Sequence, residues 1–188
     1  MIKTKEDLRL YLREDALRND VTSFWGYLLR MWVGAESARA FRYIRCMRKL
    51  EYHLNNASSL SHRLWYYYYK LKLTRLGGKY GISINPNTCG YGLRIMHLSG
   101  GGGVRLGAAS VGNYCGFNAG VLIGTNGSLD ARPTLGDHVA FGPGAKAFGK
   151  INIGSHVFVA ANAVVVKDVP DNCIVGGVPA KVIKSKEE

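Results

Sequence analysis

The stretch GLRIMHLSGGGG, residues 92–103, places one histidine between an apolar run and four consecutive glycines. Because an imidazole readily accepts a proton near neutral pH, His97 is a candidate general base. The glycines let a ligand approach the backbone closely and offer N–H groups to a developing oxyanion. The alternative is that His97 is a structural residue in the wall of the fold.

A second polar stretch, TNGSLDARP at residues 125–133, contains Asp130 and Arg132. Its Asn, Gly, Asp, Arg and Pro content predicts a protruding loop. Long loops in a compact scaffold are often functional, so this loop is a candidate for contacting a substrate.

The N-terminal residues that must position these groups follow a helical period. Thr4 and Asp7 are a capping pair for a first helix. A second helix carries an apolar stripe of Trp25, Leu28, Leu29 and Trp32. We expect a third helix over residues 36–54, and a fourth that starts near Ser61 and ends at Gly77 and Gly78.

After Gly81 the apolar residues recur every six positions. One register holds Val111, Phe117, Ile123, Leu135, Phe141, Ala147, Ile153, Val159 and Val165, and a second holds Val121, Val139, Ala145, Ile151, Val157, Ala163 and Val169. This period, with Gly or Asn at the turns, is typical of a hexapeptide β-helix, in which three hexads form a coil and the large residues stack inward. A glycine-rich β-sandwich would instead show alternation and irregular spacing. The chain is therefore predicted to be α+β, with a helical domain over residues 1–78 and a parallel β-helix domain with a C-terminal tail over residues 79–188.

Composition narrows the class of protein. The 188 residues are 47% hydrophobic and 20% charged, which is typical of a globular protein. The sequence shows no membrane-spanning run and no apolar secretory signal, so we expect a cytoplasmic protein. The four cysteines are widely spaced and are expected to be buried apolar residues. Residues 1–80 carry 16 basic and 7 acidic side chains, a net charge of +9 out of the total of +12.

Four segments resemble the hexapeptide-repeat acyltransferases, and within them the serine acetyltransferase group. They are GLRIMH (92–97), FGPGAKAFGKINIG (141–154), VAANAVVVKDVP (159–170) and VGGVPAKVIK (175–184). The resemblance implies that the β-helix is left-handed, that the protein is a homotrimer, and that acetyl-CoA binds between two β-helices. It also implies that His97 is the general base that acts on an acceptor hydroxyl.

The resemblance implies where acetyl-CoA would be held. Backbone groups at the coil corners would contact it at Gly124, Thr125, Pro143, Ala145, Ala161 and Asn162. Lys146, and Lys167 or Lys181, would reach the CoA phosphates as point charges. No metal is expected.

The chain departs from this group at two positions. The group's acidic residue in a segment resembling ISINP falls at Ser83, and its second histidine falls at Arg132. The candidates for orienting His97 are then Ser83, Asn85 and Asp130, with Asp130 preferred, and Arg132 could bind a carboxylate or phosphate of the acceptor. We therefore predict an acetyl-CoA-dependent O-acetyltransferase acting on a saccharide hydroxyl in surface or capsular polysaccharide synthesis. Serine O-acetyltransferase activity in cysteine biosynthesis is the alternative.

Two alternatives come from other classes of protein. A catalytically silent β-helix scaffold would explain the two replaced residues. A β-helical carbonic anhydrase would hold zinc with coil histidines, and His138 and His156 lie one coil apart, but they lack its ligand spacing.

Basic residues recur about every three positions along the third helix, at Arg39, Arg42, Arg45, Arg48 and Lys49, and the aromatic run WYYYYKLK follows in the fourth. The simplest interpretation is a solvated helix face. The functional interpretation is an anionic membrane surface, with the enzyme peripheral at the inner membrane; we expect no nucleic-acid partner.

Overall fold

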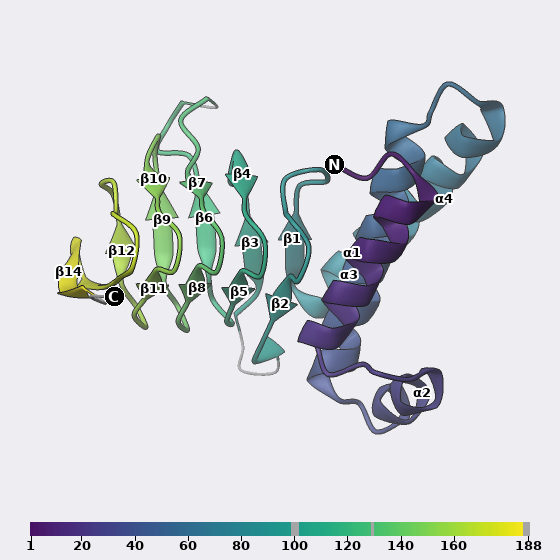
Figure 1. Cartoon of the computed structure of the whole chain (residues 1–188), viewed down its shortest axis with the longest axis horizontal. Helices are drawn as coiled ribbons and strands as arrows, with labels where there is room; N and C mark the ends of the chain where they lie inside the picture. Colours follow the sequence, from purple (N-terminus) through teal and green to yellow (C-terminus); the bar gives the residue numbers. More distant parts are fainter. Residues whose placement is uncertain (99–101, 129, 186–188) are drawn as a thin grey trace.

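The computed structural model describes residues 1–98, 102–128 and 130–185. Four helices pack together and join an elongated parallel β-helix at one end (Figure 1). The helices are α1 (Lys5–Arg18), α2 (Phe24–Trp32), α3 (Glu36–Asn55) and α4 (Leu60–Tyr80). Together with the β-helix they confirm the predicted fold class.

The β-helix is a triangular prism with three walls, each a sheet built from strands of successive coils. The five-stranded wall contains β1 (Ile82–Ile84), β3 (Val104–Leu106), β6 (Leu122–Gly124), β9 (Lys146–Phe148) and β12 (Val164–Val165). The three-stranded wall contains β4 (Ser110–Val111), β7 (Thr134–Leu135) and β10 (Asn152–Ile153). The six-stranded wall contains β2 (Arg94–Ile95), β5 (Gly116–Phe117), β8 (Ala140–Phe141), β11 (Phe158–Val159), β13 (Cys173–Gly177) and β14 (Ala180–Ser185). Neighbouring strands within each wall are parallel, except for the antiparallel pair β13 and β14 that closes the C-terminal end.

Both predicted six-residue registers point into this prism. Every residue of both registers is buried, and the rings of Phe117 and Phe141 lie 5.7 Å apart at the centre of successive coils. Because a β-helix buries its apolar side chains only when coils stack, this continuous core stabilises the whole repeat.

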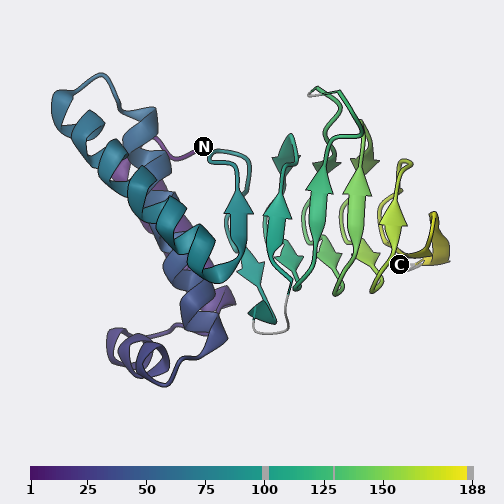
Figure 2. The same ribbon diagram turned by 180° about the vertical axis from the view of Figure 1, so that it is seen from behind.

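The described residues of the predicted loop, 125–128 and 130–133, protrude from the prism in both views (Figures 1 and 2). The loop leaves β6 and returns at β7, as predicted. Across the coil that contains the loop, Leu122 pairs with Lys146, and across the next coil Lys146 pairs with Val164. The separation along the chain between Leu122 and Lys146 is longer than that between Lys146 and Val164 by one six-residue repeat. The excursion therefore leaves the register of the following coils unchanged.

The helical boundaries follow local chemistry, with one correction to the prediction. Thr4 and Asp7 form the expected capping box at the start of α1. Gly77 and Gly78 do not end α4, which continues to Tyr80 and stops at Gly81 in the left-handed conformation, with φ of 69°. A Cβ at Gly81 would meet Gly103 of the next coil at 3.1 Å, so this position needs glycine for both conformation and space. Among the described residues, no helix is long and apolar enough to cross a bilayer.

A buried group of charges joins the helices to the first coil. Arg48 of α3 forms ion pairs with Asp15 of α1 at 2.8 Å and with Glu51 at 3.1 Å, and all three side chains are buried. Burial alone would lower the pKa of Arg48, but the charges of Asp15 and Glu51 outweigh it and raise that pKa. Arg48 therefore does not belong to the basic face predicted for α3.

The same charges hold backbone groups of the first coil. The guanidinium of Arg48 donates to the carbonyl of Cys89 at 2.9 Å. Asp15 accepts a hydrogen bond from the Leu93 N–H, and Glu51 accepts one from the Asn87 N–H. The segment that leads into β2 is thereby fixed against α1 and α3.

Candidate active site at one edge of the prism

His97 lies where the chain turns from the six-stranded wall to the five-stranded wall, an edge that we call the histidine edge. It lies just beyond β2, after Met96, it is exposed, and its backbone has a φ of 58°. No hydrogen bond joins its side chain to another described residue. An exposed imidazole at a coil corner can accept a proton from a bound hydroxyl.

Several predicted CoA contacts share the histidine edge. Pro143 follows β8, while Ala161 and Asn162 follow β11, and all three are exposed. The N–H of Asn162 donates to the Pro143 carbonyl, which fixes successive corners in line. The side chain of Lys146 bends back to this edge, where its ammonium donates to the Gly144 carbonyl at 2.9 Å.

Other predicted contacts lie elsewhere. Gly124 ends β6 and Thr125 follows it, so both lie where the five-stranded wall turns into the three-stranded wall, an edge that we call the loop edge. Ala145 is buried in the core, so only its backbone could contact a ligand. Within one chain the predicted CoA contacts are therefore divided between two edges.

The candidates for orienting His97 are not gathered around it. Asp130 is exposed in the loop of residues 125–133, at the loop edge, and Arg132 follows in the same loop. Asn85 comes just after β1, also on the side of the loop edge. Asp130, the preferred partner, thus lies on a different edge from His97, and no described hydrogen bond connects them. Contact between them would need a second chain.

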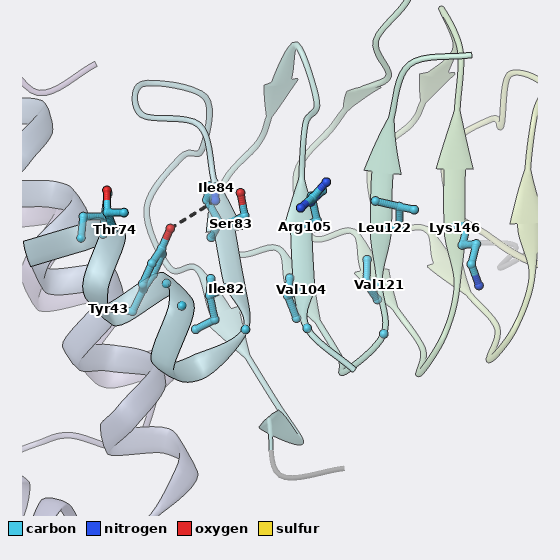
Figure 3. Close-up of a pocket in the computed structure, with 16 residues that line it drawn as sticks. Tyr43, Thr74, Ile82, Ser83, Ile84, Val104, Arg105, Val121, Leu122 and Lys146 are labelled. Carbon is cyan, nitrogen blue, oxygen red and sulfur yellow. Dashed lines mark hydrogen bonds between the residues drawn. The ribbon is translucent and has the colours of Figure 1, made fainter. Parts of the chain in front are cut away.

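Ser83 lines a groove of about 790 Å³ between α4 and the five-stranded wall (Figure 3). It lies on the outer face of β1 in register with Arg105 of β3. The row continues across the wall through Leu122 and Lys146. On the opposite side of the groove, Tyr43 accepts a hydrogen bond from the Ile84 N–H, and burial raises the pKa of Tyr43 to about 12.

A smaller pocket of about 250 Å³ adjoins the histidine edge. Its walls come from α3, α4 and the glycine segment, with Arg39, Lys79, Tyr80, Gly81, Leu98, Gly102 and Gly103 as the lining residues. Leu98 directly follows His97. Arg39 and Lys79 therefore share a pocket with the neighbour of the candidate base, and neither of them was predicted from the sequence to lie in the active site. Little in the sequence singles them out. Lys79 lies two residues before Gly81, and Arg39 is one of many basic residues in α3.

The predicted oxyanion donors can be located only in part. Gly100 and Gly101 lie outside the described residues, whereas Gly102 and Gly103 line the pocket beside Leu98. The Gly120 N–H donates to the carbonyls of Gly102 and Gly103, which fixes this end of the glycine segment against the next coil.

The cysteines form no alternative nucleophile. All four are free and buried, as expected from their spacing. Burial raises the pKa of the Cys89 thiol to about 11 and that of the Cys115 thiol to about 12. A thiol in such surroundings remains protonated near neutral pH and is a poor nucleophile.

The remaining coil histidines form a stack on the third edge. The rings of His138 and His156 lie 4.8 Å apart and nearly parallel, and Tyr114 stacks on His138 at 5.1 Å. In the part of the chain that the structure describes, there is no group of three or more His, Cys, Asp or Glu side chains that could hold a metal ion.

These features of the fold and the site define the class of protein. The chain is a hexapeptide-repeat β-helix protein with an N-terminal helical domain and a histidine at a corner of the β-helix. No family model matches the chain. The sequence is 42% identical over 107 residues to serine acetyltransferase of Synechococcus elongatus, which covers 55% of this chain and 43% of the relative. It is 35% identical over 145 residues to serine acetyltransferase 2 of Arabidopsis thaliana, which covers 73% of this chain and 44% of the relative.

The fold matches a solved protein almost throughout. The structure of Neisseria gonorrhoeae serine acetyltransferase covers 98% of this chain and 69% of its own length, with 25% identity and a TM-score of 0.72. These comparisons confirm the resemblance to the serine acetyltransferase group, and the chain is a relative of those proteins. It spans less than half the length of the Synechococcus and Arabidopsis relatives.

Proposed function

We propose that the protein is an acetyl-CoA-dependent O-acetyltransferase with His97 as general base and L-serine as the acceptor. The observation that carries the proposal is the histidine edge, where an exposed imidazole lies in line with the exposed corners at Pro143, Ala161 and Asn162. The relatives from Synechococcus, Arabidopsis and Mycobacterium tuberculosis are each named as serine acetyltransferases, which supports serine over the saccharide acceptor that the sequence favours.

The proposed reaction uses few groups. The imidazole of His97 takes the proton of the acceptor hydroxyl as its oxygen attacks the thioester carbonyl of acetyl-CoA. The new C–O bond forms, the C–S bond breaks, and the CoA thiolate leaves and takes up a proton. Backbone N–H groups of the glycine segment would stabilise the oxyanion formed on the carbonyl oxygen.

The histidine edge fits a long, anionic co-substrate. Gly144 lies at one of its corners, and a Cβ there would collide with the side chain of Asn162, so glycine is needed at this position. The Lys146 ammonium at this edge supplies a positive charge suited to phosphate. A relative from Brucella abortus has been solved in complex with coenzyme A, at 24% identity to this chain.

The division of candidate residues between two edges supports a homotrimer as part of the proposal. Gly124, Thr125, Asp130 and Arg132 belong to the loop edge, whereas His97 belongs to the histidine edge. A neighbouring chain that sets its loop edge against the histidine edge would complete the site. Asp130 or Arg132 would then come from that neighbour.

A saccharide or another acidic acceptor is the second candidate, favoured by one feature of the pockets. Arg39 and Lys79 in the smaller pocket, and Arg105 and Lys146 in the larger groove, are all cationic. No carboxylate is among the described residues that line either pocket, so the ammonium of serine would find no countercharge there within one chain. The carboxylate that the resemblance would put at Ser83 is also missing.

The test is release of free CoA thiol from acetyl-CoA, measured with L-serine and, separately, with sugar nucleotides and oligosaccharides. Release that depends on serine supports the primary proposal, and release only with a saccharide supports the second candidate. The variant His97→Asn should lose the activity, while His156→Asn, at an exposed corner of another edge, should retain it. Activity unchanged in His97→Asn would overturn the mechanism, and no release with any acceptor would favour a catalytically silent scaffold.

A further inference from the structure

A basic pocket of about 330 Å³ lies between three helices, separate from the candidate active site. Residues from α2, α3 and α4 line it: Tyr27, Leu28, Met31, Arg42, Arg45, Cys46, Lys49, Tyr69 and Lys72. Four of these side chains are cations, and no carboxylate is among the described lining residues. We call it the basic pocket.

The cations of the basic pocket crowd one another. None of the four forms an ion pair with a described carboxylate. Burial lowers the pKa of Lys49, and the neighbouring charges of Arg45 and Lys72 lower it further. Aromatic rings hold two of the cations, because Arg45 lies 5.5 Å from the ring centre of Tyr27 and Lys49 lies 5.8 Å from that of Tyr69. A bound anion would relieve this repulsion.

The helix that forms one wall of the basic pocket presents its apolar side chains to solvent. In α2 and its flanking residue, the exposed fractions are 65% for Phe24, 77% for Trp25, 61% for Leu29, 85% for Trp32 and 61% for Val33. None of the residues of α2 is buried. The helix lies at one end of the bundle, opposite the turn that joins α3 to α4 (Figure 1). A short helix with no buried face and two exposed tryptophans is poorly accounted for by packing within the chain.

The exposed apolar surface and the basic pocket are continuous. Leu28 belongs to both, since it lines the pocket and is 41% exposed. On the other side of the pocket, α4 exposes Tyr68 and Leu71 beside Lys72 and Arg75 around a second pocket of about 290 Å³. Cations therefore lie between two rows of exposed aromatic and aliphatic side chains.

We propose that the basic pocket binds the phosphate group of an anionic membrane lipid while α2 lies in the interface of the bilayer. Tryptophan and leucine on one surface with arginine and lysine beside them are what a peripheral helix needs at that boundary. Charge complementarity favours this occupant over a second copy of the chain, because residues 1–80 carry a net charge of +9 and two such surfaces would repel each other. This inference is independent of the proposed acyl transfer.

The test is flotation of the full chain with vesicles of phosphatidylcholine alone and of phosphatidylcholine with phosphatidylglycerol. We expect binding only to the anionic vesicles, weaker at high salt. Arg45→Ala with Lys72→Ala should weaken this binding roughly tenfold or more, because each cation near the surface contributes several-fold. The matched control Lys150→Ala with Lys184→Ala removes the same charge from the β-helix and should change binding by less than about threefold.

Tryptophan fluorescence tests the apolar surface separately. The chain has three tryptophans, so Trp65→Phe leaves only Trp25 and Trp32 as reporters. Their emission should shift to the blue on addition of anionic vesicles, and Trp25→Ser with Trp32→Ser should abolish flotation while the circular dichroism of the chain is kept.

Two further measurements distinguish a membrane lipid from a free phosphate ligand and from a second copy of the chain. Titration with inorganic pyrophosphate by calorimetry measures a free phosphate ligand, and sedimentation velocity measures self-association. Binding of pyrophosphate without binding to vesicles would overturn the lipid as the source of the phosphate. A fall in assembly size in Trp25→Ser with Trp32→Ser, without vesicle binding by the unaltered chain, would show that α2 contacts a second copy instead. If Lys150→Ala with Lys184→Ala reduced vesicle binding as much as Arg45→Ala with Lys72→Ala, the basic pocket would not be the lipid site.

Discussion

Replacement of Arg48 should destabilise the protein more than replacement of any exposed basic residue of α3. Arg48 forms ion pairs with the buried carboxylates of both Asp15 and Glu51. It also donates to backbone carbonyls of Cys89 and Gly90 in the first coil. In Arg48→Met the volume is roughly kept, but two carboxylates lose their partner and two carbonyls lose a donor.

The expected cost follows from the burial of this group. Removing one partner of a buried ion pair typically costs about 3–5 kcal/mol, since the remaining charge stays desolvated. For a chain of this size a loss of that magnitude corresponds to a fall in melting temperature of roughly 6–20 °C. Burial already raises the pKa of Asp15 above its usual value, more than Arg48 lowers it, so part of the loss should be relieved by protonation of Asp15.

The assay is urea denaturation followed by circular dichroism, at matched pH, for Arg48→Met and for Arg45→Ala as the control. Arg45 lies one turn earlier on α3, is exposed, makes a cation–π contact with Tyr27, and forms no ion pair with a described carboxylate. Its loss should cost about 1 kcal/mol or less. Adding Asp15→Asn to Arg48→Met should recover part of the stability. A loss below about 1 kcal/mol for Arg48→Met would refute the reasoning that these charges join the helices to the first coil.

The remaining predictions concern the cap, the core and the base. Backbone hydrogen bonds from Thr4 and Lys3 lower the pKa of Asp7 below its usual 3.8. The stabilisation of the fold by the Asp7 carboxylate is therefore present above that value and is lost as the pH falls through the folded-state pKa. The difference in stability between the unaltered chain and Asp7→Asn, measured against pH, should vanish in acid, and a constant difference would contradict this. Phe117→Ala should cost about 3–5 kcal/mol in urea denaturation, because it opens a cavity beside Phe141; a cost near 1 kcal/mol would mean that the coil collapses around the gap. His97→Asn should lower kcat by about 10²- to 10⁴-fold with little change in melting temperature, because Asn also adopts positive φ; a large loss of stability would instead show a structural role.

The six-residue period of the sequence was sufficient to predict the β-helix, but it does not reveal the loop between β6 and β7. Val111 pairs with Leu135 across the coil that contains the loop, and Leu135 pairs with Ile153 across the next coil, which is shorter by one whole repeat. Because the loop lengthens its coil by one repeat, Leu129 stays on the six-residue grid although it lies outside the described residues. Composition, and not spacing, indicated the loop.

The helical domain was predictable in its elements but not in which faces are buried. Periodicity identified the stripe on α2, yet Trp25 and Trp32 are among the most exposed large side chains. It also placed Arg48 with the basic residues of α3, whereas its guanidinium is buried against Asp15. An apolar or basic stripe has the same spacing whether it contacts the core, a carboxylate on another helix or the surroundings of the protein. Only the positions of α1 and the first coil decide between these outcomes.

The candidate site was predicted in its residues but not in their division between edges. Ser83 and Arg105 face one groove because they are paired between β1 and β3. Their separation along the chain is not a whole number of six-residue repeats, so the period of the sequence does not predict this pairing. Arg39 and Lys79 reach the pocket beside His97 only because the helices pack against the first coil. These contacts depend on tertiary structure, which repeat spacing does not encode.

The backbone conformation of His97 does not by itself distinguish a catalyst from a corner residue. His138 and His156 have nearly the same positive φ, of 55° and 57°, at corners where their rings stack on each other and on Tyr114. A histidine in this conformation is therefore an ordinary corner residue in this fold. What separates His97 is its edge, since its ring has no described stacking partner, a cationic pocket adjoins it, and the exposed corners of Pro143 and Asn162 continue in line with it. The argument for catalysis thus depends on what surrounds the imidazole, and the comparison of His97→Asn with His156→Asn tests that difference directly.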